Sequence, residues 1–158
     1  MVNDKIRKKV KNEFTEYLTL RKHRKTSERY AILDQIYSID GHFDMDSLYR
    51  SMLKSGFRVS RSTLYNTMDL LLDCSLVVKH QFGANTAQYE RAYGNENHDH
   101  IICVDCGEVR ETENNLISES QLKKIRRFKV SYYSMYIYGV CSKCSHARRM
   151  KLNRLRRK

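Results

Sequence analysis

Four of the five cysteines in this 158-residue chain form two C-x-x-C pairs. The first motif contains Cys103 and Cys106, and the second contains Cys141 and Cys144. Between Cys106 and Cys141 lie 34 residues. Four thiolates suit a tetrahedral zinc ion, and each short loop lets both of its sulfur atoms face one metal. Gly107, directly after the first pair, allows the close turn that such loops favour. A shell of four sulfur ligands leaves no open coordination position, so the sequence predicts a structural zinc site.

Other interpretations of the cysteines are four reduced core thiols or a redox pair. Structural disulfides are disfavoured because the N-terminal residues lack the apolar segment of a secretory signal, which predicts a cytoplasmic protein. The fifth cysteine, Cys74, lies between Leu72 and Leu76. We expect it to be an ordinary core residue.

A second group of metal-ligating residue types begins just before the first cysteine pair. His98 and His100 are two residues apart, so on a strand both imidazoles point to the same face. Glu111 follows the cysteine pair and offers a carboxylate. Imidazole and carboxylate ligands together suit Fe(II), Mn(II) or Zn(II). The residues alone do not decide whether His42 and Glu90, earlier in the chain, join this site.

An enzyme would need more than these ligands. An open coordination position at His98, His100 and Glu111 would be compatible with metal catalysis. The sequence offers no further acid–base pair and no nucleophile constellation, however. We therefore expect no enzymatic activity and no small organic ligand.

The elements that position these residues are separated by glycine and turn residues, because the chain has no proline. Apolar residues at helical spacing predict a first amphipathic helix from Ile6 to Leu18 with a basic outer face. Capping residues predict three further helices. These begin at Thr26 or Ser27, after Asp44 and after Ser60, the last running to about Asp73. Two β-rich segments, 76–82 and 86–91, with a turn at 83–85, predict a hairpin.

Three helices followed by a hairpin is the element order of a winged helix-turn-helix, whose last helix enters the DNA major groove. The alternative is a small α+β core without a DNA role. Residues 1–30 hold ten Lys and Arg against four Asp and Glu, and residues 145–158 hold seven against none. Basic terminal segments favour salt-sensitive binding to DNA phosphates, although charge alone also fits any polyanion.

The second half of the chain predicts a smaller module: a strand over 98–110, a charged helix over 115–128 and an alternating strand over 130–140. About 60 residues bury little apolar surface, so this module would benefit from a metal and a partner chain. Apolar runs such as Leu70–Leu72 are too short to span a membrane.

The predicted fold class is α+β, with an N-terminal winged helix-turn-helix domain followed by a small α/β dimerisation domain that holds the structural zinc. The expected segments are a DNA-binding domain over 1–93, a hinge over 94–97, a metal-binding dimerisation domain over 98–145 and a basic tail over 146–158. We expect the tail to be a frayed helix or disordered.

These motifs resemble those of the ferric uptake regulator family. The stretch HDHIICVDCGEVRE resembles the family signature H-x-H-x-x-C-x-x-C-G-x-x-x-E. The segments TSERYAIL, GHFDMDSLY and SRSTLYNTMDLL, and the closing C-x-x-C after YIYG, also match in the right order. The similarity covers roughly residues 20–144. It implies a homodimeric winged-helix repressor whose DNA-binding domain is hinged to a dimerisation domain.

The resemblance also implies two sets of metal ligands. The structural zinc would be bound by Cys103, Cys106, Cys141 and Cys144. The regulatory metal would be bound by His42, Glu90, His98, His100 and Glu111. Because this second set comes from both domains, one ion would fix the angle between them and the spacing of two recognition helices on a palindrome. We expect an Fe(II)-dependent repressor of iron-uptake genes, with Mn(II) or Zn(II) able to substitute.

Zinc, manganese and peroxide sensors of the same family are the alternatives. Peroxide sensors of this type tend to carry aspartate where this chain has Glu90 and Glu111. Zinc sensors often use a cysteine in the hinge site, and this chain has none there. Both differences favour iron. The alternative from another class is a metal-independent architectural DNA binder, whose affinity would respond to salt but not to a chelator.

For DNA contact, the resemblance points to Tyr65 in the predicted recognition helix and to Arg24, which could reach a minor groove. Ser62 and Thr63 can contact phosphates or thymine methyl groups. The alternatives are that Tyr65 is buried and that Arg61 is merely a solvated charge. The expected partner is double-stranded DNA carrying an AT-rich palindrome, with no membrane involved.

The chain departs from the family pattern at three places. Asn66 stands where many members carry arginine, and asparagine favours adenine edges. We expect a further metal site of many members to be absent or crippled, because its positions correspond to Asn97, Ser118 and Tyr133, with only Asp99 retained. The tail is basic, whereas histidine-rich or acidic tails are common in the family.

Overall fold

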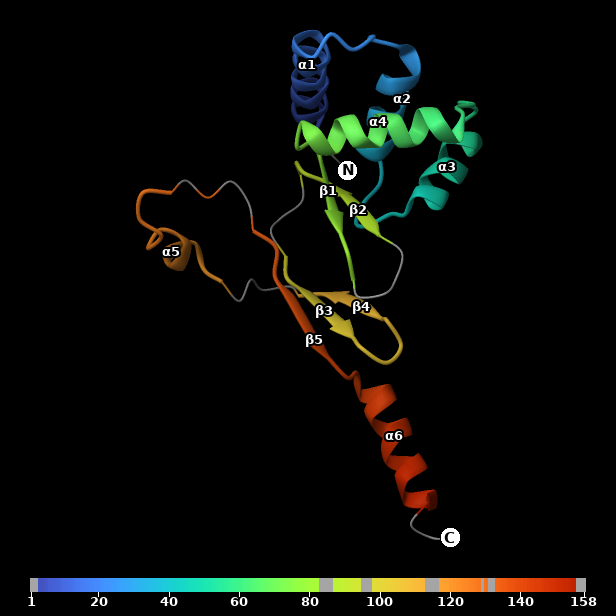
Figure 1. Ribbon diagram of the computed structural model, residues 1–158, viewed down its shortest axis with the longest axis vertical. Helices are drawn as coiled ribbons and strands as arrows, with labels where there is room; N and C mark the ends of the chain where they lie inside the picture. The colour runs from blue at the N-terminus through green and yellow to red at the C-terminus, as the bar shows by residue number, and fades with distance from the viewer. Residues whose placement is uncertain are drawn as a thin grey trace. The chain divides into compact units, whose positions relative to one another are not determined.

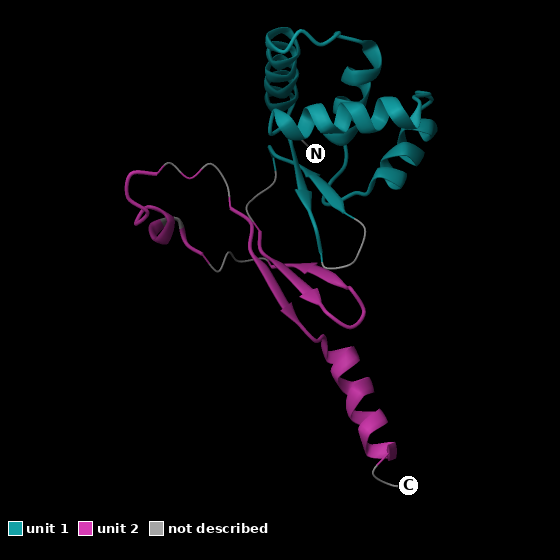
Figure 2. Cartoon of the chain, viewed as in Figure 1, with its two compact units in different colours: residues 1–95 teal, residues 96–158 magenta. Residues whose placement is uncertain are grey.

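The computed structural model is an α+β protein whose chain divides into a first unit, residues 1–95, and a second unit, residues 96–158 (Figures 1 and 2). The structure describes residues 3–82, 87–94, 98–112, 117–128, 130 and 133–155. Among these residues, no helix is both long enough and apolar enough to cross a membrane.

The first unit begins with four helices, α1 (Asp4–Leu20), α2 (Ser27–Ile36), α3 (Met45–Lys54) and α4 (Arg61–Asp73). The predicted starts after Asp44 and Ser60 are confirmed. The Asp44 carboxylate accepts the Ser47 N–H at 2.6 Å, and the Ser60 hydroxyl accepts the Thr63 N–H at 3.0 Å. Thr26 is the residue before α2, but its side chain makes no capping hydrogen bond.

The hydrophobic core of the first unit uses one face of each helix, as the spacing of apolar residues predicts. Phe14 and Leu18 of α1, with Leu71 of α4, are completely buried. The other core residues on these helices are Val10, Ile32, Leu33, Ile36, Met45, Leu48, Met52, Leu64 and Met68. This core fixes the four helices relative to one another.

An antiparallel hairpin completes the first unit. Strand β1 (Val77–His80) pairs with β2 (Gln88–Arg91), with Val78 opposite Glu90. The two strands confirm the predicted hairpin, while its expected turn at 83–85 lies outside the described residues. Phe43, just before α3, joins β2 through two backbone hydrogen bonds with Tyr89, of 2.9 and 2.8 Å.

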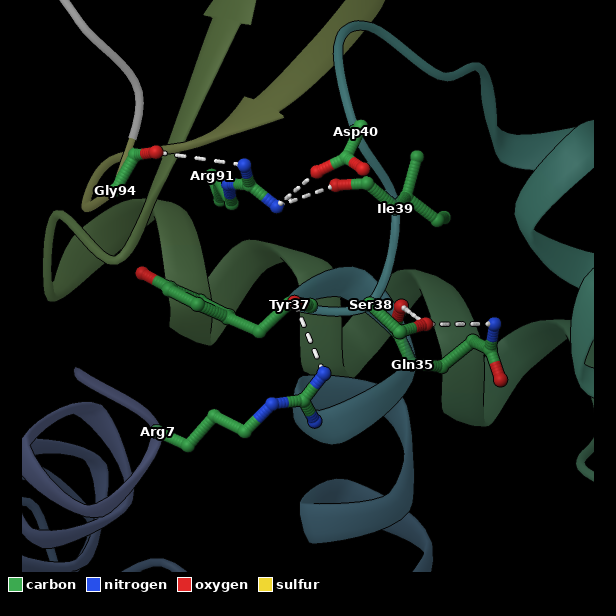
Figure 3. A network of polar contacts seen from close by, with 8 residues as sticks. All are labelled: Arg7, Gln35, Tyr37, Ser38, Ile39, Asp40, Arg91 and Gly94. Carbon is green, nitrogen blue, oxygen red and sulfur yellow. Dashed lines mark hydrogen bonds and ion pairs between the residues drawn. The ribbon is translucent and has the colours of Figure 1, made fainter. Parts of the chain in front are cut away.

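Arg91, at the end of β2, connects the hairpin to the segment that follows α2 (Figure 3). Its guanidinium donates to the Ile39 carbonyl at 2.8 Å and pairs with the Asp40 carboxylate at 3.0 Å. On the other side of the same segment, Arg7 of α1 donates to the Tyr37 carbonyl at 3.3 Å. These contacts hold the chain that leads into His42 against the strand that carries Glu90.

The second unit is built on a three-stranded sheet in the order β4-β3-β5. Strand β3 (His100–Cys103) pairs antiparallel with β4 (Val109–Glu111) and parallel with β5 (Tyr136–Gly139). The helices of this unit are α5 (Glu119–Leu122) and α6 (Ser142–Leu155). Figure 1 shows α6 continuing from β5 beyond the sheet.

Two expectations for the second unit are wrong in part. The single strand expected over 98–110 is two strands, because the chain turns back after Cys103, with the Gly107 N–H donating to the Cys103 carbonyl at 2.9 Å and Gly107 at a φ of 72°. In the described part, the helix expected over 115–128 is only the four residues of α5, and the apolar side chains of Ile125 and Phe128 after it remain exposed rather than forming a buried face. Residues 115 and 116 lie outside the described part.

The expectations for the C-terminal region also need correction. Within the predicted strand 130–140, only Tyr136–Gly139 pairs with a neighbour, and residues 131 and 132 lie outside the described part. Over its described residues the basic tail is helical, which agrees with the first of its two expected states, but it is not a separate segment. It is the continuation of α6, which starts at Ser142 inside the second cysteine pair and runs to Leu155.

Candidate metal centres and DNA-binding surface

The hairpin of the first unit gathers three titratable side chains, His42, His80 and Glu90, which we call the first-unit cluster. Tyr89 is part of the hydrophobic core, so Glu90, the next residue on the strand, points to the opposite face. Val78 is opposite Glu90 in the register, and His80, two residues further, lies on the same face. The backbone pairing of Phe43 with Tyr89 brings the neighbouring His42 beside Glu90.

The two carboxylate oxygens of Glu90 face different histidines. His80 Nε2 is 2.8 Å from Glu90 Oε1, and His42 Nε2 is 3.7 Å from Glu90 Oε2. The first distance is a hydrogen bond, and the second is too long for one. Ligand atoms held about 2.0–2.2 Å from one ion are roughly 3.0–3.5 Å apart, so His42 and Glu90 lie near the separation of two metal ligands.

His80, which is 1% exposed, belongs to this cluster although it was not predicted from the sequence. Its ring lies parallel to Phe82, with centroids 5.5 Å apart, and meets the His42 ring edge-on at 5.2 Å. The available signal was the strand alternation. Once Val77 faces the core, His80 must point to the same side as Glu90 across the hairpin.

The second-unit cluster consists of His98, His100 and Glu111. Strand register places His100 opposite Glu111, and His98 Nε2 lies 4.0 Å from Glu111 Oε1. The two imidazole rings are 4.7 Å apart between centroids, which agrees with the predicted shared face. The ring of His100 is stacked on Tyr136 of β5 at 5.5 Å. Two imidazoles and one carboxylate are thus adjacent within this unit.

The four paired cysteines lie close together in the second unit. Their sulfur atoms all lie within 4.8 Å of one another, and Cys106 Sγ is 3.9 Å from Cys141 Sγ. In a tetrahedral zinc site with Zn–S bonds of about 2.3 Å, sulfur atoms are roughly 3.8 Å apart. The residues present therefore fit one zinc ion.

Backbone and thiol contacts tune these cysteines in opposite directions. Hydrogen bonds from the backbone N–H groups of Cys141 and Cys106 lower the pKa of the Cys103 thiol to about 6. Side-chain hydrogen bonds with Cys141 and Cys106 raise the pKa of the Cys144 thiol to about 12, because they favour its protonated form. A divalent cation favours the deprotonated form and allows all four sulfur atoms to bind as thiolates.

The first half of α4 presents most of the residues predicted to contact DNA. Tyr65 is 48% exposed and Asn66 is exposed, so the alternative of a buried Tyr65 is wrong. Ser62 and Thr63 have their hydroxyl oxygens 2.9 and 2.8 Å from Ser60 Oγ. These residues lie at the open N-terminal end of the helix.

Two arginines were also predicted to contact DNA. Arg61 is not simply solvated, because Nη1 donates to Asp46 Oδ1 at 2.7 Å and the guanidinium lies 4.7 Å from the centroid of the Tyr49 ring. Arg24 is exposed in the link between α1 and α2, and its carbonyl accepts a hydrogen bond from Arg29.

Two residues at the positions of the family's further metal site make other contacts. The Tyr133 hydroxyl donates to the Ile117 carbonyl at 3.2 Å, and Ser118 Oγ is 2.8 Å from Ser120 Oγ. Asp99 is buried next to His100, while Asn97 lies outside the described residues.

Comparisons with known proteins give one consistent result. The model of the ferric uptake regulator family matches residues 21–138. The ferric uptake regulation protein of Campylobacter jejuni is 34% identical over 125 residues, which cover 77% of this chain and 79% of that protein. The Pseudomonas aeruginosa ferric uptake regulator, solved with manganese, is 25% identical with a TM-score of 0.62, covering 81% of this chain and 97% of that one.

The Helicobacter pylori ferric uptake regulator supports the fold alone. It has a TM-score of 0.68 at 19% identity and covers 88% of this chain and 93% of its own.

Proposed function

The chain belongs to the ferric uptake regulator family of metal-responsive transcriptional regulators, and we propose that it is a metal-dependent DNA-binding repressor with Fe(II) as its regulatory metal. The proposed targets are iron-uptake genes. The observation that carries this proposal is the presence of two kinds of metal-ligand group: a closed set of four sulfur atoms, and nitrogen and oxygen clusters on both units.

The proposed structural metal is zinc, bound by Cys103, Cys106, Cys141 and Cys144. Support comes from the close spacing of the sulfur atoms, which fits tetrahedral coordination. This zinc would connect the turn after β3 to the start of α6. Its role would be to stabilise the second unit, since a full sulfur shell has no position for a substrate.

The proposed regulatory metal is bound by His42 and Glu90 from the first unit and by His98, His100 and Glu111 from the second. Each cluster by itself offers few ligands for an ion that prefers about six, so ligands from both units would be needed for tight binding. A metal that binds only the joined arrangement stabilises that arrangement by mass action. The domains over 1–93 and 98–145, with the hinge at 94–97, are the parts that such an ion would fix.

The DNA-binding part of the proposal assigns α2, α3, α4 and the hairpin to a winged helix-turn-helix. The supporting observation is the exposed N-terminal half of α4, where Tyr65 and Asn66 are accessible. A recognition helix contacts base edges with residues near its N-terminus. A homodimer would then place two copies of α4 on an AT-rich palindrome.

Manganese or zinc sensing by the same ligands is the second candidate. Nitrogen and oxygen ligands do not discriminate strongly among these divalent ions. The Pseudomonas aeruginosa relative was solved with manganese. Glu90 and Glu111, in place of aspartate, favour a metal sensor over a peroxide sensor.

The test is fluorescence anisotropy of zinc-loaded protein on a duplex from its own promoter region, without oxygen and at fixed salt. Fe(II), Mn(II) and Zn(II) are titrated separately. We expect one metal to tighten DNA binding by about tenfold or more, which is roughly 1.4 kcal/mol of coupling. His98→Ala should abolish this gain, whereas the control His23→Ala, which lies outside both clusters, should retain it.

DNA affinity that ignores every metal but falls steeply with salt would overturn the proposal. The protein would then be a metal-independent architectural DNA binder.

A further inference from the structure

The positive charge of the chain is concentrated beyond the part that matches the family. The family model ends at residue 138, and residues 139–158 hold eight of the 30 Lys and Arg residues but none of the 18 Asp and Glu residues. The described part of this segment is mainly α6, Ser142–Leu155. The family match therefore does not explain the function of residues 139–158.

All five basic side chains of α6 are exposed, and the helix has no buried residue. They are Lys143, Arg148, Arg149, Lys151 and Arg154. Arg148 pairs with Asp105 in the turn between β3 and β4. Within the described part of the chain, no carboxylate forms an ion pair with the other four. These four charges are available to an anionic partner.

Among the described residues, the contacts that hold α6 lie at its N-terminal end. Its first turn contains Cys144, whose N–H donates to Cys141 Sγ at 3.5 Å, and the Cys141 N–H donates to Cys103 Sγ at 3.3 Å. The ion pair of Arg148 with Asp105 adds a second attachment one turn later. The cysteine cluster thus fixes the direction of α6, while no carboxylate among the described residues forms an ion pair with the basic side chains of its last two turns.

Like charges weaken these last two turns. Arg148 and Lys151, and then Lys151 and Arg154, are three residues apart, a spacing at which equal charges on a helix repel. A helix of 14 residues without a buried face is marginal in water. An anionic partner would relieve the repulsion and stabilise the helix.

The side chains favour duplex DNA over a membrane surface. A helix that lies on a membrane needs one continuous apolar face. Of the three exposed large apolar residues of α6, Leu152 and Leu155 are three residues apart and share a side, whereas Met150 points about 200° away from Leu152 around the helix axis, so they form no continuous face. Lysine and arginine on an exposed helix of about 21 Å suit the regular phosphates of a nucleic acid backbone.

We propose that α6 is a second DNA-binding element, which contacts the phosphate backbone of duplex DNA without reading sequence and is oriented by the cysteine cluster. The inference rests on the proposed function, because it takes DNA as the anionic partner of α6. It deepens that function by adding a contact outside the predicted recognition helix. The contact strengthens binding to all sequences alike, because phosphates carry no sequence information directly.

The test compares two triple variants with the same loss of charge in the same unit. The first is Arg149→Gln, Lys151→Gln and Arg154→Gln in α6, since glutamine keeps the helix propensity. The matched control, in the exposed segment after α5, is Lys123→Gln, Lys124→Gln and Arg126→Gln. The affinity of each zinc-loaded protein is measured by anisotropy over a range of salt concentrations. One 30-base-pair duplex carries the promoter sequence, and the other carries the same bases scrambled.

Each phosphate contact contributes about 0.9 to the slope of log affinity against log salt, so we expect the α6 variant to lose about 2–3 units of slope on both duplexes. The control variant should keep the wild-type slope. Arg149→Lys with Arg154→Lys, which keeps both charges, should also keep it. The regulatory metal should still increase the affinity of the α6 variant for the promoter duplex.

Equal slopes for the wild type and the α6 variant would overturn the inference, as would equal losses in both triple variants. A larger loss on an RNA hairpin than on DNA at the same salt would overturn it in favour of RNA. If the α6 effect is observed but no metal changes promoter affinity in the wild type, the proposed function fails while the inference on α6 stands.

Discussion

The first unit buries one face from each of four helices, whereas the buried hydrophobic residues in the described part of the second unit are Ile102 and Cys103 alone. The sheet of the second unit has strands of only three or four residues, and Ile101, Tyr138 and Val140 remain exposed. Apolar burial is the main stabilising contribution to a fold, so the two units cannot be stabilised in the same way.

This difference in apolar burial determines what each unit needs in order to fold. The first unit can fold from its own sequence, which gives a stable platform for α4 and for the cluster around Glu90. The second unit is small, and domains with so little core commonly require a metal or a partner chain. Ferric uptake regulators bind DNA as dimers, and exposed apolar side chains on the sheet are compatible with a partner.

The largest expected effect comes from removing the cysteine ligands. Replacing Cys106 and Cys141 by serine should abolish stoichiometric zinc binding and unfold the second unit, since the free energy of structural zinc binding, about 10–16 kcal/mol in small domains, is also free energy of folding. Amide hydrogen exchange should then show loss of protection in β3, β4 and β5, with protection of α1 to α4 retained.

Cys74→Ser is the matched control for that experiment. Cys74 follows α4 in the first unit, where its Sγ lies 3.6 Å from the Leu71 carbonyl, so this variant should keep one zinc and a folded second unit. If the double serine variant loses protection equally in both units, the contrast between them is wrong.

A smaller effect is expected at His80, which connects the core of the first unit to the proposed regulatory metal. Its hydrogen bond to Glu90 orients the carboxylate, and removing such a bond to a metal ligand typically weakens metal binding 10–100-fold. His80→Phe should therefore lower the affinity of zinc-loaded protein for Co(II), followed by its visible absorption. His80→Gln, which keeps a hydrogen-bond donor, should lose less.

His23→Gln provides the control, because His23 is exposed and lies outside both clusters. Unchanged Co(II) affinity in His80→Phe would show that Glu90 is oriented without His80. The first-unit cluster would then owe its geometry to the Phe43–Tyr89 pairing alone.

The contrast between the units also explains how far the sequence predicts the structure. The helices α1 to α4 follow from hydrophobic spacing and from capping by Asp44 and Ser60, because those signals are local and the core requires them. In the second unit the apolar pattern is weak, so the division into β3 and β4 and the short α5 do not follow from hydrophobic spacing, although Gly107 is a local signal for the turn after Cys103.

Site residues show the same division. The four cysteines and the pair His98 and His100 are close in the sequence or share a strand face, so their adjacency could be predicted. The position of His80 depends on the register of β1 against β2, and the pairing of Arg61 with Asp46 joins two helices. Strand alternation gives the face on which His80 lies but not its partner across the hairpin, and the Arg61–Asp46 pair has no local signature.

The smallest expected effect is on the stability of the first unit, and it tests whether apolar packing alone stabilises that unit. Thr67 of α4 is 1% exposed, and its hydroxyl oxygen has no hydrogen-bond partner among the described residues. An unpaired buried hydroxyl costs about 1–3 kcal/mol, and valine has nearly the same shape. Thr67→Val should therefore stabilise the first unit by about 1 kcal/mol in urea unfolding, with no change in the second.

Thr15→Val is the opposite case, since the Thr15 hydroxyl donates to the Lys11 carbonyl at 2.7 Å and lies 2.9 Å from the Tyr30 hydroxyl. Removing these contacts should destabilise the same unit or leave it unchanged. Destabilisation by Thr67→Val would mean that its hydroxyl is paired in solution, for example with a carbonyl of the preceding helical turn. In that case the core of the first unit depends on a polar contact as well as on apolar burial, and its contrast with the second unit is one of degree.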